Sequence, residues 1–217
     1  MSSRPDEKRI VGGTQVTPNA YPWMVLITGN NTPACGGSII SDQYVVTAAH
    51  CTSLRYRQEE LKVVVGQQNY CTPDNKIAIF SIEKMIIHPL FNDTDFSYDI
   101  MLLKLSMRIL FNDIVRPICL PFWGKFKFAF PFVLTKVNDL DIPETEATIL
   151  GWGVTAFNSL NRSCELQEAT VNVIPRKKCL MNSHYTLQLL PDTLICAGVS
   201  DGSKDSCQVS PIFIFNT

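Results

Sequence analysis

The chain has 217 residues, 46% of them hydrophobic, so it can bury a sizeable core as one domain or as two closely packed halves. Its formal net charge is -1, and 19 Lys and Arg are interspersed with 20 Asp and Glu. Because no basic stretch could hold a phosphate backbone, nucleic acid is not an expected partner. No apolar stretch approaches the length of a membrane span, so none is expected.

Most apolar residues fall in short runs rich in Val, Ile and Leu and bounded by Gly, Pro, Asn and Asp, which is typical of β-strands. The runs before residue 106 predict six strands, at 24–28, 37–40, 44–48, 61–65, 77–87 and 100–105. Later runs predict three more, at 146–150, 166–174 and 193–197. We find no amphipathic pattern of helix length and no internal repeat. The sequence therefore predicts an all-β fold with fewer strands in its second half.

An aromatic-rich segment, Phe122 to Leu134, separates the two groups of strands. Its partial alternation could indicate a strand or a membrane-seeking loop. Its length and proline content favour an inserted linker between the halves.

Eight cysteines, and no close Cys-x-x-Cys pair of the kind that zinc and redox sites use, indicate a disulfide framework and no metal site. N-glycosylation acceptor sequences begin at Asn30, Asn92 and Asn161, in loop-like stretches. Both features favour a secreted protein. Residues 1–9, however, have no apolar core of the kind that a signal peptide contains, so we expect no signal peptide in this chain.

Five motifs follow one another in a characteristic order after Lys8-Arg9: Ile10-Val11-Gly12-Gly13, Thr47-Ala48-Ala49-His50-Cys51, Asp99-Ile100-Met101-Leu102-Leu103-Lys104-Leu105, Gly151-Trp152-Gly153 and Asp205-Ser206-Cys207-Gln208. From Ile10 to Gln208 the chain resembles the chymotrypsin/trypsin family of serine proteases, and among them multidomain secreted members such as the ovochymases. The resemblance implies two antiparallel six-stranded β-barrels. It also implies a hydrolase without a cofactor, whose partners are polypeptide substrates or protease inhibitors.

The resemblance assigns roles to individual residues. His50 matches the general base, and Asp99 the carboxylate that orients it. Asp205 matches the floor of the specificity pocket, where a carboxylate selects a substrate Arg or Lys. The bond between Arg9 and Ile10 matches the activation cleavage site. The alternatives are a purely structural histidine at position 50 and a solvated loop acid at position 205, while His88 and His184 are expected to be structural.

After Gln208, where the family continues with Gly-Asp-Ser-Gly-Gly-Pro, the chain reads Val209-Ser210-Pro211 and reaches Thr217 without that motif. The nucleophile, the oxyanion glycine and the aspartate that receives the new amino terminus are therefore expected to be missing, and the second barrel incomplete. Ser210 falls at the place of that aspartate and is followed by a proline without an N–H, so it is a poor substitute nucleophile. We divide the chain into three parts: a propeptide remnant (1–9), the protease domain (10–208) with barrel one at about 24–110 and an incomplete barrel two at about 145–208, and a tail outside the family (209–217).

The eight cysteines allow 105 pairings, among which the sequence alone cannot choose. The resemblance implies disulfides between Cys35 and Cys51 and between Cys179 and Cys196. It also brings together the loops that carry Cys71 and Cys164, which suggests a third pair. Two further cysteines are expected to be free in this chain: the partner of Cys207 would lie in the missing part, and Cys119 matches a cysteine that bridges to a propeptide or upstream domain.

These features predict a serine endopeptidase domain by ancestry, directed at Arg or Lys and inactive in this form. One alternative is a non-catalytic pseudoprotease that acts as a binding module. Another is a truncated splice product without a function.

Overall fold

The computed structural model describes residues 9–11, 13–53, 56–72, 74–120, 146–153, 162–182, 190–199, 205–207 and 212–215. Nearly all regular elements in these ranges are β-strands, which confirms the predicted all-β class. The helices described are short: α1 (His50–Ser53), α2 (Arg176–Asn182) and a 3-10 turn at Gln58–Glu60. None of the helices in the described ranges is both long and apolar enough to cross a membrane.

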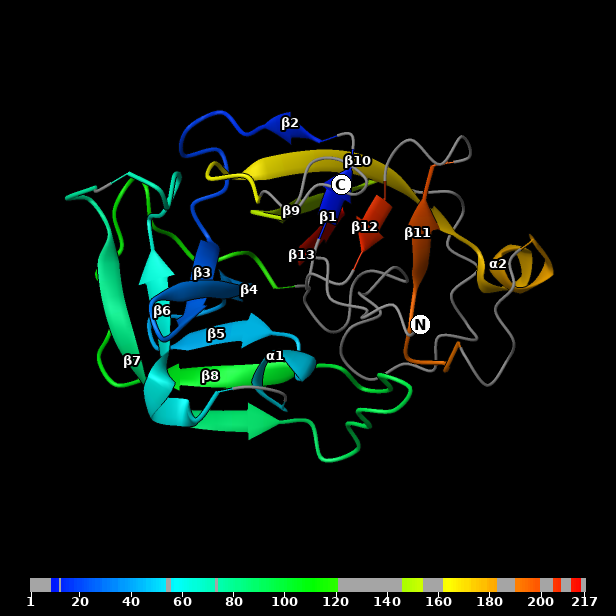
Figure 1. Ribbon diagram of the computed structural model, residues 1–217, viewed down its shortest axis with the longest axis horizontal. Helices are drawn as coiled ribbons and strands as arrows, with labels where there is room; N and C mark the ends of the chain where they lie inside the picture. The colour runs from blue at the N-terminus through cyan, green and yellow to red at the C-terminus, as the bar shows by residue number, and fades with distance from the viewer. Residues whose placement is uncertain are drawn as a thin grey trace, which may run out of the picture.

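Six antiparallel strands of the first half close into a barrel in the order β3-β4-β5-β8-β7-β6 (Figure 1). Their bounds are β3 (Met24–Gly29), β4 (Thr32–Ile39), β5 (Tyr44–Thr47), β6 (Leu61–Val65), β7 (Ala78–Ile87) and β8 (Met101–Leu105). Alternate residues of β8, namely Met101, Leu103 and Leu105, point into a core that excludes water almost completely. This period of two is the one that the sequence pattern indicated.

Strand β4 is longer than the strand that the sequence predicted at 37–40, and the hairpin that joins β3 to β4 explains the difference. Asn30 and Asn31 both have positive φ, 49° and 62°, as a two-residue type I′ turn requires. The Thr32 hydroxyl donates a hydrogen bond to the Gly29 carbonyl at 2.7 Å. Because of this turn, the pairing of β4 with β3 begins at Thr32. It continues through a stretch that contains Pro33 and has a weak preference for strand structure.

The second half forms an antiparallel sheet in the order β11-β10-β9-β13, with β2 paired to β10, and this sheet does not close within the described residues. The strands are β2 (Thr14–Gln15), β9 (Glu146–Gly151), β10 (Gln167–Ile174), β11 (Cys196–Gly198) and β13 (Ile212–Phe215). Ala147, Ile149 and Val171 form its buried centre. An incomplete second sheet is what we predicted.

Strand β13 lies in the segment 209–217, to which the sequence assigned no strand. It pairs with β9 along its whole length, from Ile212 opposite Leu150 to Phe215 opposite Ala147. The tail thus supplies one edge of the second sheet as far as the chain is described. A separate two-stranded ladder pairs β1 (Arg9–Val11) with β12 (Asp205–Cys207).

An apolar cluster joins the two halves. Barrel one contributes Met24, Leu26 and Val64, and the second half contributes Leu150, Trp152 and Leu166, all at most 5% exposed. Burial of this kind stabilises the seam by about 25 cal/mol for each Å² removed from water. The relative position of the halves is therefore set by a packed core and not only by loops.

Candidate active site

His50 and Asp99 form the central contact of the candidate site. The His50 Nδ1 atom lies 2.6 Å from Asp99 Oδ2, and the His50 backbone N–H donates to Asp99 Oδ1 at 2.8 Å. The two side chains are 23% and 16% exposed. With a carboxylate at Nδ1, the neutral imidazole carries its proton on that nitrogen, and Nε2 is then a base.

Elements of barrel one hold this pair in place. His50 is the first residue of α1, which follows β5, and a disulfide from Cys51 to Cys35 ties α1 to β4. The Thr47 hydroxyl donates to the Gly36 carbonyl at 2.7 Å and fixes the end of β5 to the same strand. Asp99 lies two residues before β8, the neighbour of β5 in the barrel. Residues 49 positions apart in the sequence are therefore brought together by adjacent strands.

The loop before Asp99 contains two aromatic residues that the sequence reading missed. Phe96 and Tyr98 both have positive φ, 57° and 53°, which is uncommon for bulky residues and marks local strain. The Phe96 ring meets the His50 ring edge-on, with centroids 5.8 Å apart. The Tyr98 ring stacks on the His88 ring, with centroids 4.7 Å apart.

A contact between the halves also reaches this loop. The backbone N–H of Tyr98 donates a hydrogen bond to the Thr193 hydroxyl at 3.0 Å. Thr193 lies in a segment anchored by Arg176, which donates to the carbonyls of Leu190 and Pro191 and pairs with Asp192. No sequence signal indicated Thr193, because the contact depends on how the halves dock.

The Sγ atoms of Cys35 and Cys51 and a ring nitrogen of His50 lie within 4.8 Å of one another. The two sulfurs are bonded to each other at 2.02 Å, so they are not available as thiolate ligands. This group is a disulfide beside a histidine and not a metal centre.

The structure joins all three of the cysteine pairs that the resemblance implied: Cys35 with Cys51, Cys71 with Cys164, and Cys179 with Cys196. Cys119 is exposed and forms no disulfide in the described part of the chain. Cys207 lies in β12, and its pairing stays a prediction.

The remaining site residues are described only in part. The backbones of Arg9, Ile10 and Asp205 are placed by the ladder of β1 and β12, in which Ile10 lies opposite Ser206 and Val11 opposite Asp205. Asn30 and Asn92 are exposed. The described residues do not include Asn161, His184, Ser210 or the aromatic segment 122–134.

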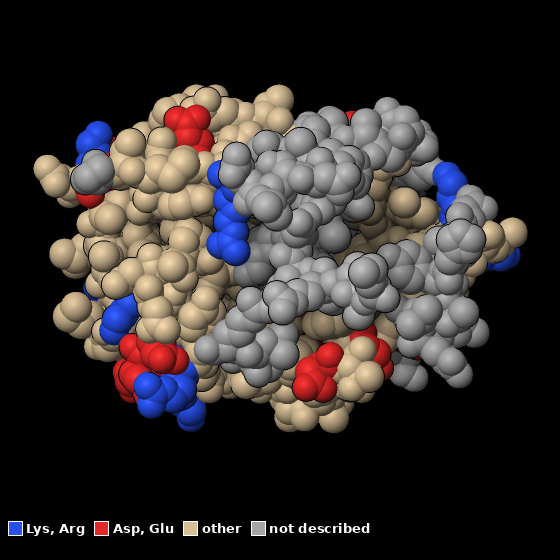
Figure 2. Space-filling model, in the orientation of Figure 1, with Lys and Arg blue, Asp and Glu red and all other residues tan. Residues whose placement is uncertain are grey.

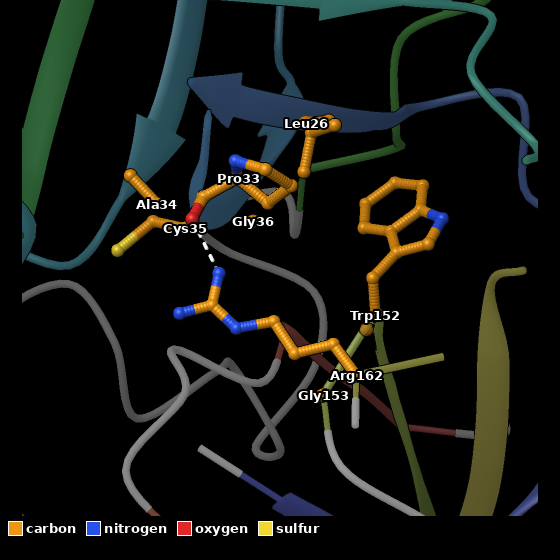
Figure 3. Close-up of a pocket in the computed structure, with 9 residues that line it drawn as sticks. Leu26, Pro33, Ala34, Cys35, Gly36, Trp152, Gly153 and Arg162 are labelled. Atoms are coloured by element: carbon orange, nitrogen blue, oxygen red, sulfur yellow. Dashed lines mark hydrogen bonds between the residues drawn. The ribbon is translucent and has the colours of Figure 1, made fainter. Parts of the chain in front are cut away.

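A shallow hollow lies between β4 and the Gly151-Trp152-Gly153 turn (Figure 3). Leu26, Pro33 and Trp152 give it apolar walls. The Arg162 guanidinium reaches across it and donates to the Pro33 carbonyl at 2.6 Å, so this side chain links the halves at the surface.

Among the described residues on the face shown in Figure 2, the charged side chains are scattered over the surface. On the face shown in Figure 2, acidic and basic groups lie close together at one edge of the molecule. Ion pairs such as Lys104 with Glu83 and Arg116 with Asp113, each at 2.6 Å, are exposed and contribute little stability.

Comparisons with known proteins agree with this geometry. The family model described as "Trypsin" matches residues 10–209. The chain is 33% identical over 213 residues to the clotting factor G beta subunit of Tachypleus tridentatus, covering 94% of this chain and 64% of that protein. It is 30% identical over 203 residues to coagulation factor XI of Bos taurus, covering 92% of this chain and 30% of that protein. The chain thus spans less than two thirds of the length of either relative.

The match to the family model covers nearly the whole chain, and the closed first barrel brings together the histidine and aspartate of the two strongest motifs. By descent, the chain belongs to the trypsin family of serine proteases.

Proposed function

We propose that the chain is a serine endopeptidase domain by ancestry that does not hydrolyse peptide bonds in the form given by this sequence. The proposal rests on a mismatch between the catalytic pair, which is present, and the nucleophile motif, which is not. The hydrogen bond between His50 and Asp99 is of the kind that joins a general base to the carboxylate that orients it. The connection between β12 and β13, residues 208–211, reads Gln-Val-Ser-Pro and lacks the Gly-Asp-Ser-Gly-Gly of the family.

The chemistry of acyl transfer explains why this mismatch matters. A base at His50 Nε2 accelerates the reaction only if it removes a proton from a hydroxyl within hydrogen-bond reach. The tetrahedral oxyanion then needs backbone N–H donors, which the family takes from the glycine-rich motif. Ser210 is the single hydroxyl in the connection, and Pro211 after it cannot donate a hydrogen bond.

A fluorophosphonate reagent tests the absence of a nucleophile, because it labels a serine that a histidine activates. We expect no stoichiometric labelling by intact-mass analysis and no turnover of Arg or Lys ester substrates, with trypsin as the positive control. Labelling of Ser210 that disappears in the variant Ser210→Ala would overturn the proposal.

We also propose that cutting after Arg9 does not switch the domain on. In related proteases the freed amino group pairs with a buried aspartate before the nucleophile, and this sequence has Ser210 at that place. The uncut chain already pairs β1 with β12, which supports the proposal. Circular dichroism and inhibitor binding should be the same before and after the cut, whereas a large ordering transition would contradict it.

The ancestral specificity is proposed to be for Arg and Lys, with Asp205 as the selecting carboxylate. We further propose that the domain is extracellular and that Cys119 forms a disulfide with an upstream segment, since an exposed thiol pairs readily in an oxidising compartment. Non-reducing peptide mapping of the longer protein tests this link: a Cys119 recovered as a free thiol would contradict it.

A non-catalytic binding module is the second candidate. It is favoured by the closed first barrel and by apolar side chains that remain exposed there, including Leu110 at 86% and Met107 at 61%. Saturable binding of a protease or protease inhibitor to the purified chain, weakened by the variant Leu110→Asp, would support this candidate. A chain that is retained and degraded in cells would instead indicate a truncated product without a function.

A further inference from the structure

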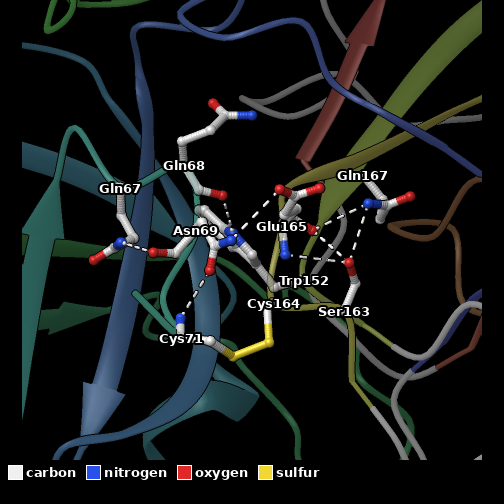
Figure 4. The surroundings of a disulfide bond; sticks show 9 residues. All are labelled: Gln67, Gln68, Asn69, Cys71, Trp152, Ser163, Cys164, Glu165 and Gln167. Carbon is white, nitrogen blue, oxygen red and sulfur yellow. Dashed lines mark hydrogen bonds between the residues drawn. A yellow bond between two sulfur atoms is a disulfide. The ribbon is translucent and has the colours of Figure 1, made fainter. Parts of the chain in front are cut away.

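The disulfide between Cys71 and Cys164 crosses the seam between the two halves (Figure 4). Cys71 belongs to the segment after β6 in barrel one, and Cys164 lies shortly before β10 in the second half. Their Cα atoms are 5.3 Å apart although 93 positions separate them in the sequence. The disulfides at Cys35 and Cys179, by contrast, join residues 16 and 17 positions apart within one half.

A short antiparallel contact lies directly beside this bridge. The Tyr70 N–H donates to the Cys164 carbonyl, and the Leu166 N–H donates to the Gln68 carbonyl, both at 3.0 Å. The Trp152 indole N–H donates to the same Gln68 carbonyl at 3.2 Å. The main-chain contact between the halves here is thus a few residues long, and the covalent bridge closes it at one end.

This bridge is also the most accessible of the three in the described chain. Cys71 is exposed and Cys164 is half-buried. Each of the other two pairs has one cysteine that is nearly inaccessible, Cys35 at 6% and Cys179 at 8% exposed. Since thiol–disulfide exchange requires a thiolate to reach a sulfur atom, accessibility separates this pair from the others.

We propose that Cys71–Cys164 is a redox-modification site, a clip that a dithiol reductant opens to loosen the docking of the second half on barrel one. One thiolate of the reductant attacks Sγ of Cys71, the S–S bond breaks, and Cys164 leaves as a thiolate that takes up a proton. The second thiol of the reductant then attacks the mixed disulfide and frees the Cys71 thiol. The chain gains two electrons and two protons, and the reductant becomes a disulfide.

Opening the clip leaves the seam to its hydrogen bonds and its apolar cluster. Without the cross-link the halves separate locally more often, so the amides of Tyr70 and Leu166 become accessible to solvent more often. Amides in the centre of barrel one, such as that of Leu103, do not take part in this opening. The inference concerns the docking of the halves, so it holds whether or not the domain is catalytic.

Limited reduction of the native full-length chain with dithiothreitol tests the clip. After quenching and alkylation, peptide mapping should find Cys71 and Cys164 labelled at least about tenfold faster than the other two pairs. Hydrogen exchange at Tyr70 and Leu166 should then be at least about tenfold faster, with that at Leu103 unchanged. The variant Cys119→Ser is the matched control, because it removes the exposed thiol that could exchange with the bridge from within the chain.

Two results would overturn the inference: reduction of Cys71–Cys164 no faster than that of the other pairs, or fast reduction that leaves exchange at Tyr70 and Leu166 unchanged. The double variant Cys71→Ser with Cys164→Ser should reproduce the exchange of the reduced chain without any reductant. If that variant does not fold, reduction of the natural chain still decides the question, because it starts from the folded protein.

Discussion

At the scale of single residues, the surroundings of His50 show which contacts of a site a sequence motif can predict. The pair of His50 and Asp99 was predictable because two strong motifs mark it and the barrel brings the motifs together. Phe96 was not predictable, since its contact with His50 arises from a positive φ that no local residue type favours. Thr193 was missed because its hydrogen bond to Tyr98 crosses between the halves.

Tyr21 links barrel one to the second sheet by donating a hydrogen bond to Glu168. Burial, followed by this hydrogen bond and the charge of Glu168, raises the pKa of Tyr21 from 10.0 to about 12. Well below pH 10 the phenol is protonated in both the folded and the unfolded state. Between the two pKa values the unfolded state loses the proton first, so the contribution of Tyr21 to the free energy of unfolding falls as the pH rises.

The variant Tyr21→Phe tests this contribution in urea unfolding experiments between pH 8 and pH 11. At pH 8 the variant should be less stable by about 1 kcal/mol, the typical net value of a hydrogen bond. The difference between the two proteins should narrow above pH 10. A difference that stays constant across this range would show that the phenol does not titrate differently on folding.

Gly29 is required by a close approach. A Cβ at this position would lie 2.4 Å from Cε1 of the Tyr56 ring. Gly29→Ala should therefore reduce the free energy of unfolding by about 1–3 kcal/mol, the usual cost of overpacking. Gly198→Ala is the matched control, because its Cβ would meet no atom closer than 4.0 Å. In a chain that already carries Tyr56→Ala, the substitution Gly29→Ala should reduce the free energy of unfolding by less. A reduction of the same size would refute this explanation.

At the scale of elements, the predicted strands of barrel one are all present, because each is a run of branched residues with one face buried. The start of β4 was misjudged, since the turn at Asn30 and Asn31 and not the local composition decides it. Strand β13 escaped prediction for another reason. Its four residues lie beyond the last family motif, and nothing in the sequence indicated that they pair with β9.

Proline substitutions in β13 test whether the tail strand protects β9. Proline removes a backbone N–H. Of two successive residues in an antiparallel strand, one donates its N–H to the neighbouring strand on a given side. One of the variants Phe213→Pro and Ile214→Pro should therefore speed hydrogen exchange in β9, at Thr148 and Ile149, by at least about tenfold. Asn216→Pro, beyond the strand, is the control. Exchange that is equally slow in all three variants would mean that β13 does not cover β9 in solution.

At the scale of the whole molecule, the two halves differ in how well their structure could be predicted from the sequence. Barrel one closes, as its six strands and two motifs predicted. The second sheet remains open as far as the chain is described, and its position depends on the apolar cluster around Trp152 and on the bridge from Cys71 to Cys164.

A chimera tests the proposed function of the whole molecule. Replacing residues 209–217 with the family's segment, from Gly-Asp-Ser-Gly-Gly-Pro onward, supplies the nucleophile, the oxyanion donors and the strands that follow them in the family. Because His50 and Asp99 are already hydrogen-bonded, we expect the chimera to cleave after Arg or Lys once it is cut after Arg9. His50→Ala and Asp99→Asn should each lower kcat/KM by roughly 10³-fold or more.

The same chimera separates chemistry from specificity. Asp205→Ser should leave its reaction with an unselective serine reagent intact and abolish its preference for basic substrates, because the charge that pairs with the substrate side chain is removed. Asp201→Ser is the matched control in a neighbouring position and should change neither. Cleavage after aromatic residues by the unmodified chimera would show that Asp205 is not the floor of the pocket. A rate that does not respond to His50→Ala would show that His50 is not the base, even though it is hydrogen-bonded to Asp99.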